Sequence, residues 1–188
     1  YGSDNLEGKK VLVQGIGHVG EVLVQHLTES GALVTITDIN EDRVNQVGAK
    51  HGAKIFTGAD LYSADVDIYA PCALGATIND ATINNFKASI IAGAANNQLA
   101  NEAVHGKILK EKGILYAPDF LINAGGVINV YSELVKWTNA QVMEKTENIY
   151  NTALEIFKFA DDNNITTHQA AFSMAQKRID DAKNELKK

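Results

Sequence analysis

The sequence predicts an α/β protein built on a doubly wound, mostly parallel β-sheet, with a helical extension at the C-terminal end. Two observations lead to this fold class. Short apolar runs of strand length alternate with amphipathic stretches of helix length over the first two-thirds of the chain. After Pro118 the strand-like runs stop, and apolar residues recur at helical spacing. Strands that alternate with helices form βαβ units, and such units build parallel sheets.

Six apolar runs are the candidate strands. Residues 11–13, Val-Leu-Val, are apolar without interruption, as expected of a parallel strand that is covered on both faces. The second run covers residues 33–37 and ends at Asp38. The remaining candidates are residues 54–56, 67–70, 89–92 and 114–117.

The stretches between and after these runs are the candidate helices. Residues 19–30 form the first, because Val19, Leu23 and Leu27 recur on one helical face. Asn40 is a suitable N-cap for a second helix that begins at Glu41. Near the C-terminus, spacing of three and four predicts a long helix, a break at residues 161–164 and a last helix. In the long helix the inward positions are Thr146, Ile149, Ala153, Ile156 and Ala160. In the last helix they are Ala171, Ala175, Ile179, Ala182 and Leu186.

Composition excludes several classes of protein. The 188 residues carry a net charge of −6, spread along the chain, which argues against a nucleic-acid-binding surface. One cysteine rules out an internal disulfide and a Cys-X-X-Cys metal site, and favours a cytoplasmic setting. No apolar run approaches the roughly 20 residues of a membrane helix. We therefore expect neither nucleic acid nor membrane as a partner.

Gly15, Gly17 and Gly20 form a GxGxxG pattern that follows the first strand and opens the first helix. In that setting the first glycine permits a tight turn, the second lets the backbone approach a pyrophosphate, and the third lets the helix pack closely on the sheet. The pyrophosphate would lie at the positive end of the helix.

Asp38 ends the second strand, 18 residues after Gly20, near the position where a carboxylate binds the adenosine ribose. A carboxylate there would repel a 2′-phosphate, and no Arg or Lys follows before Arg43, so the pattern favours NAD over NADP. The alternative is a turn that binds no phosphate, with Asp38 as a cap. The agreement of strand, loop, helix and acid predicts a Rossmann-type fold that binds NAD.

Three loops rich in small residues and amides follow later strands, at residues 71–75, 93–99 and 118–130. Ligands of such sheets bind beyond the carboxyl ends of the strands, so these loops should face the nicotinamide. Asn97 and Asn123 are the amides we expect there, although Asn96 could replace Asn97, and each could instead be a loop cap.

The other reactive side chains give weaker signals. Cys72 has no neighbouring base and is interpreted as a small buried thiol, and His18 as a loop residue beside the cofactor. The other histidines, His26, His51, His105 and His168, share no metal-ligand spacing with one another or with an acid pair, so we expect no metal site. Asp119 is the only charged residue in the three loops, and alone it cannot provide both an acid/base group and a carboxylate-binding group. The acid/base chemistry is therefore expected elsewhere.

The motifs LEGKKVLVQGIGHVG, TDIN, APCALGATIND, IIAGAANNQL and GILYAPDFLINAGGVINV together resemble the cofactor domain of the Glu/Leu/Phe/Val-type amino-acid dehydrogenases, and among them most of all the leucine dehydrogenases. The resemblance implies reversible, NAD-dependent oxidative deamination of an L-amino acid to its 2-oxo acid and ammonia. A branched-chain substrate, leucine above all, is expected. Phenylalanine and valine dehydrogenases stay open as alternatives, as does a nucleotide-sensing module without catalysis.

The resemblance also assigns residues. Residues 15–20 would hold the pyrophosphate, Asp38 the adenine ribose, and Cys72, Ala73 and Asn97 would border the nicotinamide ribose. Asn123 would lie between nicotinamide and substrate, with Gly126 and Val127 in the pocket wall. The full expected cofactor set is Gly15, Ile16, Gly17, His18, Val19, Gly20, Asp38, Ile39, Cys72, Ala73, Ala94, Asn97 and Asn123.

The family's catalytic Lys, carboxylate-binding Lys and catalytic Asp belong to an N-terminal domain, so no catalytic residue is expected in this sequence, which alone should be inactive. A chain that begins at Tyr1 fits a cut between those domains. We expect residues 1–130 to form the dinucleotide-binding domain. Residues 131–188 should form helices that pack on it and toward the missing substrate domain, in a parent protein that is a homo-oligomer.

Overall fold

The computed structural model describes residues 1–185, which form a six-stranded, entirely parallel sheet. The spatial order is β3-β2-β1-β4-β5-β6. The bounds are β1 (Lys10–Gln14), β2 (Leu33–Thr37), β3 (Lys54–Ile55), β4 (Ile68–Pro71), β5 (Ile90–Ile91) and β6 (Leu115–Tyr116). The chain order reverses between β1 and β4, which are paired with Val13 beside Ala70. The predicted doubly wound sheet is confirmed, with β3, β5 and β6 shorter than their apolar runs.

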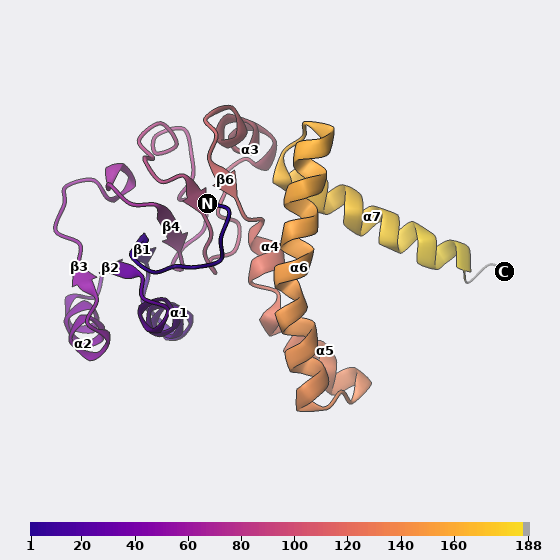
Figure 1. Ribbon diagram of the computed structural model, residues 1–188, viewed down its shortest axis with the longest axis horizontal. Helices are drawn as coiled ribbons and strands as arrows, with labels where there is room; N and C mark the ends of the chain where they lie inside the picture. The colour runs from indigo at the N-terminus through magenta and orange to yellow at the C-terminus, as the bar shows by residue number, and fades with distance from the viewer. Residues whose placement is uncertain (186–188) are drawn as a thin grey trace.

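Helices cover both faces of this sheet (Figure 1). Helices α1 (His18–Glu29) and α2 (Glu41–His51) lie on one face, and α3 (Glu102–Glu111) lies on the other, with the short 3₁₀ helix η1 (Leu61–Ser63) before β4. Successive side chains of β1 point to opposite faces of the sheet, so the strand contributes to a hydrophobic core on each face. Val11 and Val13 pack with α1 and α2, whereas Leu12 points to the opposite layer.

Helix starts follow the local sequence. The predicted N-cap Asn40 is confirmed, because its side chain accepts a hydrogen bond of 3.0 Å from the Arg43 backbone N–H. After β6 the chain forms α4 (Asp119–Ile122), α5 (Gly125–Val135), α6 (Asn139–Asn163) and α7 (Thr167–Glu185). A reciprocal capping box of Thr138 and Gln141 opens α6 earlier than the apolar spacing predicts.

The sequence predicts a helix break at residues 161–164, but residues 161–163 are helical, so the prediction is wrong for them. Helix α6 continues through Asp161 and Asp162 to Asn163, because both aspartates are exposed and leave the helical hydrogen bonds intact. Asn164 ends the helix in the left-handed conformation, with a φ of 53°. Asparagine adopts that conformation more easily than most residues.

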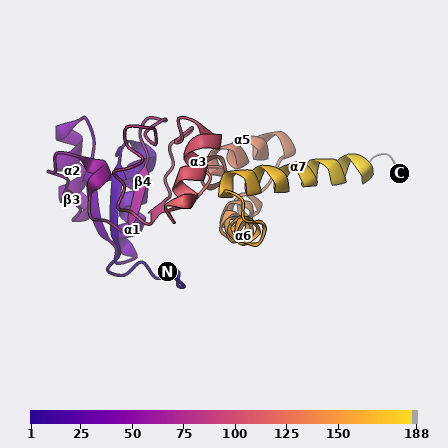
Figure 2. The same ribbon diagram turned by 90° about the horizontal axis from the view of Figure 1, so that it is seen from above.

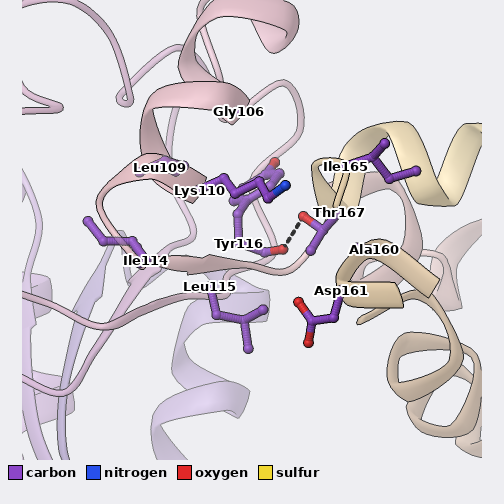
Figure 3. Close-up of a pocket in the computed structure, with 11 residues that line it drawn as sticks. Gly106, Leu109, Lys110, Ile114, Leu115, Tyr116, Ala160, Asp161, Ile165 and Thr167 are labelled. Atoms are coloured by element: carbon purple, nitrogen blue, oxygen red, sulfur yellow. Dashed lines mark hydrogen bonds between the residues drawn. The ribbon is translucent and has the colours of Figure 1, made fainter. Parts of the chain in front are cut away.

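The helical extension joins the sheet at the turn between α6 and α7. There the Thr167 hydroxyl donates a 2.7 Å hydrogen bond to the Tyr116 carbonyl at the end of β6 (Figure 3). A small core around Ile156, Ala160 and Ala171 holds α6 against the start of α7. The rest of α7 reaches away from the other elements (Figures 1 and 2), so the predicted inward position Ile179 is half-exposed, and Leu186 lies outside the described residues. Among residues 1–185, no helix has both the length and the apolar character to cross a membrane.

Candidate functional site

The glycine loop joins β1 to α1 at the point where the strand order reverses. Gly15 has a φ of +92°, which side-chain-bearing residues rarely adopt, and its N–H donates to the Thr37 carbonyl at 2.8 Å. A Cβ on Gly15 would lie 2.5 Å from the Cβ of Ala73. Glycine is therefore required here both by conformation and by the loop that follows β4.

Gly17 is different, because it faces open space. It is exposed at the N-cap of α1, and no described atom beyond its chain neighbours lies within 4 Å of the position of an added Cβ. Within residues 1–185, no side chain caps this helix. The first N–H groups of α1 thus meet an open surface, which is where a helix binds an anion.

Gly20 has a role that differs from the predicted one. A Cβ on Gly20 would lie 2.0 Å from the carbonyl oxygen of Gly15, and only at 3.6 Å from the nearest side-chain atom of Cys72. The close approach is therefore between α1 and its own glycine loop, and less between α1 and the sheet. His18 and Val19, between the last two glycines, are exposed.

Asp38 holds the glycine loop from the end of β2. One carboxylate oxygen accepts a 2.9 Å hydrogen bond from the Ile16 N–H, and the other accepts one of 3.0 Å from the Asn40 N–H. The capping role that the sequence left open is thus present. Each carboxylate oxygen can accept a second hydrogen bond, so a ribose hydroxyl can still be bound. The neighbouring Ile39 is fully exposed.

A charged cluster that the sequence analysis missed lies beside this loop. Arg43 donates through Nε to the Ile16 carbonyl at 3.2 Å, and its guanidinium pairs with Glu21 of α1. Glu21 also pairs with Lys50 at 2.8 Å and lies 3.4 Å from His51. The hydrogen bond from Lys50, with smaller contributions from His51 and Arg43, lowers the pKa of Glu21 to about 2. Glu21 is therefore ionised at neutral pH.

The loops after β4 and β5 cross at close range. A Cβ on Gly93 would lie 2.2 Å from the Pro71 carbonyl, which accepts a hydrogen bond from the Ala95 N–H. Cys72 is half-buried in this crossing, and burial raises the pKa of its thiol. A raised pKa disfavours the thiolate, which agrees with the interpretation of Cys72 as a packing residue.

Two amides of the site are joined by a side-chain hydrogen bond. Asn123 donates through Nδ2 to Asn96 Oδ1 at 2.5 Å and to the Ala94 carbonyl at 3.3 Å. Asn97 is exposed and left-handed, with a φ of 52°, and its carbonyl accepts from the Ala76 N–H at 2.7 Å. The structure thus joins Asn123 to Asn96, and leaves the Asn97 side chain on the open side of the loop.

Gln98 is a further residue of this region that was not predicted from the sequence. It is fully buried, and its Nε2 donates to the Gly93 and Ala95 carbonyls at 2.6 and 2.9 Å. Its backbone N–H donates to the buried Asp119 carboxylate at 3.3 Å. Asp119 therefore holds this loop and does not face an open site. In the sequence Gln98 is one of three adjacent amides, and spacing alone does not tell which of them is buried.

Most of the expected site residues follow the carboxyl ends of the strands, and three of them line one hollow. A hollow of about 920 Å³ is lined by His18 and Val19 of α1, Ala94 after β5, and Gly125 at the start of α5. Gly126 and Val127 are exposed in the next positions of α5. The other expected residues, Ile39 and Asn123 among them, do not line this hollow. A separate hollow, between α3, β6 and the α6–α7 turn, is lined by none of the expected residues (Figure 3).

Comparison with known proteins assigns the family. A family model described as Glutamate/Leucine/Phenylalanine/Valine dehydrogenase matches residues 38–186. The chain belongs to this family. It is 48% identical over 180 residues to a leucine dehydrogenase of Thermoactinomyces intermedius, covering 96% of this chain and 49% of the relative. It is 45% identical over 186 residues to an L-tryptophan dehydrogenase of Nostoc punctiforme, covering 99% of this chain and 53% of the relative.

The structures agree with this family assignment. The crystal structure of L-tryptophan dehydrogenase from Nostoc punctiforme superposes with a TM-score of 0.93 and 46% identity, covering 97% of this chain and 55% of that one. The chain thus spans about half the length of the dehydrogenases it matches. Relatives named for leucine and for tryptophan match almost equally well, so the family assignment leaves the amino acid open.

Proposed function

We propose that this chain is the NAD-binding part of an amino-acid dehydrogenase that reversibly deaminates an L-amino acid to its 2-oxo acid and ammonia. The observation that carries the proposal is the open, uncapped start of α1 at the reversal point of the sheet, with Gly17 exposed and Asp38 bonded to the same loop. This arrangement fits a dinucleotide: the helix offers N–H groups to the pyrophosphate, and the carboxylate offers acceptors to a ribose.

Each expected residue then has a task. The backbone of residues 15–20 would hold the pyrophosphate, and Asp38 with Ile39 would face the adenosine ribose. Cys72, Ala73, Ala94 and Asn97 would border the nicotinamide ribose. NAD accepts a hydride from the substrate carbon when bound. Asn123, with Gly126 and Val127 one turn later, would meet the substrate.

Asn123 is suited to that task because its orientation is fixed. Its amide nitrogen donates to Asn96 and to the Ala94 carbonyl, so its Oδ1 is directed by two hydrogen bonds made on the other side. A positioned amide oxygen can accept a hydrogen bond from the amino group of a substrate. The side chain binds and orients the substrate here and moves no proton.

Two observations favour NAD over NADP. The Asp38 carboxylate would repel a 2′-phosphate. The Arg43 guanidinium, the first cation after Asp38, is paired with Glu21 and bonded to the Ile16 carbonyl. A 2′-phosphate would therefore meet the Asp38 carboxylate and an Arg43 guanidinium that is already paired with Glu21.

The proton-transfer and carboxylate-binding groups are proposed to come from a substrate domain outside these 188 residues. The chain spans about half of its relatives, and Asp119, the one charged residue of the three site loops, is bonded to the Gln98 backbone. We propose residues 1–130 as the dinucleotide domain and residues 131–188 as helices that reach toward that second domain. A cytoplasmic homo-oligomer acting on a branched-chain amino acid, leucine first, completes the proposal.

Two measurements test the function. The chain alone should bind NADH in a calorimetric titration and should produce no NADH from amino acids. The longer protein, with a substrate domain attached, should reduce NAD in the presence of leucine, valine or isoleucine. Turnover with tryptophan or phenylalanine alone would replace the branched-chain substrate of the proposal by an aromatic one. Inactivity with all of these amino acids would contradict the dehydrogenase proposal.

A further inference from the structure

Arg43 presents a conflict within the candidate NAD site. It lies in the first turn of α2, five residues after Asp38, where a cation can accommodate the 2′-phosphate of NADP. Asp38 at the end of β2 favours the opposite choice. Sequence position alone therefore does not decide what Arg43 does, and its contacts must.

Two of the three side-chain contacts of Arg43 join it to α1 and the glycine loop, and the third is to Gln46 of its own helix. Its Nε donates to the Ile16 carbonyl at 3.2 Å, one terminal nitrogen lies 3.4 Å from Gln46 Oε1, and the other pairs with Glu21. Asp38 binds the N–H of the same Ile16. The peptide groups on both sides of Ile16 are thus held, one by the acid of β2 and one by the arginine of α2.

Glu21 is what fixes Arg43 there. The side chains of Glu21 and Arg43 are 17% and 31% exposed, so water screens this pair only partly. Glu21 is also anchored by Lys50 and lies within 3.4 Å of His51, both at the C-terminal end of α2. One carboxylate on α1 therefore faces two cations of α2 and sets the charge beside the ribose end of the loop.

We propose that Glu21 determines the cofactor preference by holding the Arg43 guanidinium against the glycine loop and cancelling its charge. This inference rests on the proposed NAD site. Without the carboxylate, Arg43 and Lys50 both lose their anionic partner while staying on α2. The 2′-phosphate of NADP would then be the anion beside Arg43 and Lys50. It would accept the charge-assisted hydrogen bonds that Glu21 accepts in the unaltered chain.

The test is a set of calorimetric titrations with NADH and NADPH on the whole chain. Glu21→Gln keeps the size of the side chain and removes the charge. We expect it to tighten NADPH about tenfold, the gain of one charge-assisted hydrogen bond, and to leave NADH little changed. Glu29→Gln, on the exposed end of the same helix, is the matched control and should change neither affinity.

Two further variants separate the proposed route from a general charge effect. The double variant Glu21→Gln with Arg43→Gln should lose the gain for NADPH, because Arg43 is its source. Arg43→Gln alone should affect NADH and NADPH equally, since the arginine supports the loop in both cases. It also tests the idea if Glu21→Gln does not fold.

Three results would overturn the inference. They are an unchanged preference in a folded Glu21→Gln variant, a gain for NADPH that survives in the double variant, and a selective loss of NADPH binding in Arg43→Gln. In each of these, NADH binding would persist and the proposed function would stand. Failure of the unaltered chain to bind either nucleotide would instead overturn the function, and this inference with it.

Discussion

Separate replacement of Gly15 and Gly17 by alanine should have different effects within one loop. Gly15→Ala should lower the stability of the fold, and Gly17→Ala should mainly weaken cofactor binding. At Gly15 an alanine must adopt a φ near +92°, which costs about 1–2 kcal/mol for an L-residue. Its Cβ would also lie 2.5 Å from the Ala73 Cβ and 2.7 Å from the Ala73 nitrogen. Overpacking of this kind costs about 1–3 kcal/mol.

The two terms together predict that Gly15→Ala lowers the free energy of unfolding by about 2–5 kcal/mol. For a chain of this size each kcal/mol moves the melting temperature by about 2–4 °C, so the midpoint should fall by about 4–20 °C. Circular dichroism at 222 nm, followed through a thermal melt, measures the change.

Gly17→Ala is the matched control, because Gly17 has an ordinary φ of −64° and open space around it. Alanine is a poorer N-cap than glycine, so the free energy of unfolding should fall by only about 1 kcal/mol or less. The added methyl occupies the approach to the first turn of α1, and NADH should bind about tenfold more weakly or worse. Equal melting temperatures for both variants, or unchanged NADH binding in Gly17→Ala, would refute the reasoning.

Three further predictions concern the loops and the charged cluster. Gln98→Leu should lower the free energy of unfolding, measured in a urea titration, by about 2–4 kcal/mol, because the Gly93 and Ala95 carbonyls lose a buried donor. A change below about 0.5 kcal/mol, as expected of an exposed substitution, would contradict this. Asn123→Leu should abolish amino-acid turnover of the longer protein and weaken NADH binding by the chain far less, because most of the expected cofactor contacts lie elsewhere. Retained turnover would remove Asn123 from the substrate site. Glu21, whose pKa is lowered from 4.5 to about 2, stabilises the fold above pH 4.5 and loses that effect as the pH falls toward 2. Urea midpoints of the unaltered chain and Glu21→Gln should therefore converge over that range, and a constant difference would speak against the ion pair.

Much of the fold was predictable because its signals are local. The apolar run at Val11 is long enough to mark a strand covered on both faces, and Asn40 before two acidic residues marks a helix start. Alternation of strands and helices then leaves few topologies other than a parallel sheet. The end of α6 was misjudged because aspartate is unfavourable but tolerated in an exposed helix, and only Asn164 takes the left-handed conformation that stops it.

The candidate site was less accessible to sequence reasoning, because its decisive contacts join distant segments. Glu21 and Arg43 are 22 residues apart and belong to no spacing rule, yet they meet because α1 and α2 lie side by side on one face of the sheet. Asn96, Asn97 and Gln98 are chemically alike and consecutive. Only the packing of their loop against Asp119 and Asn123 decides that Gln98 is buried and that Asn96, rather than Asn97, bonds to Asn123.

Calorimetric titration of this chain with NADH tests the central claim most directly. The open first turn of α1 and the Asp38 carboxylate predict one saturable site, with NADH bound more tightly than NADPH and binding weakened in Gly17→Ala. Absence of heat from NADH, with the chain folded by circular dichroism, would contradict the claim, as would tighter binding of NADPH.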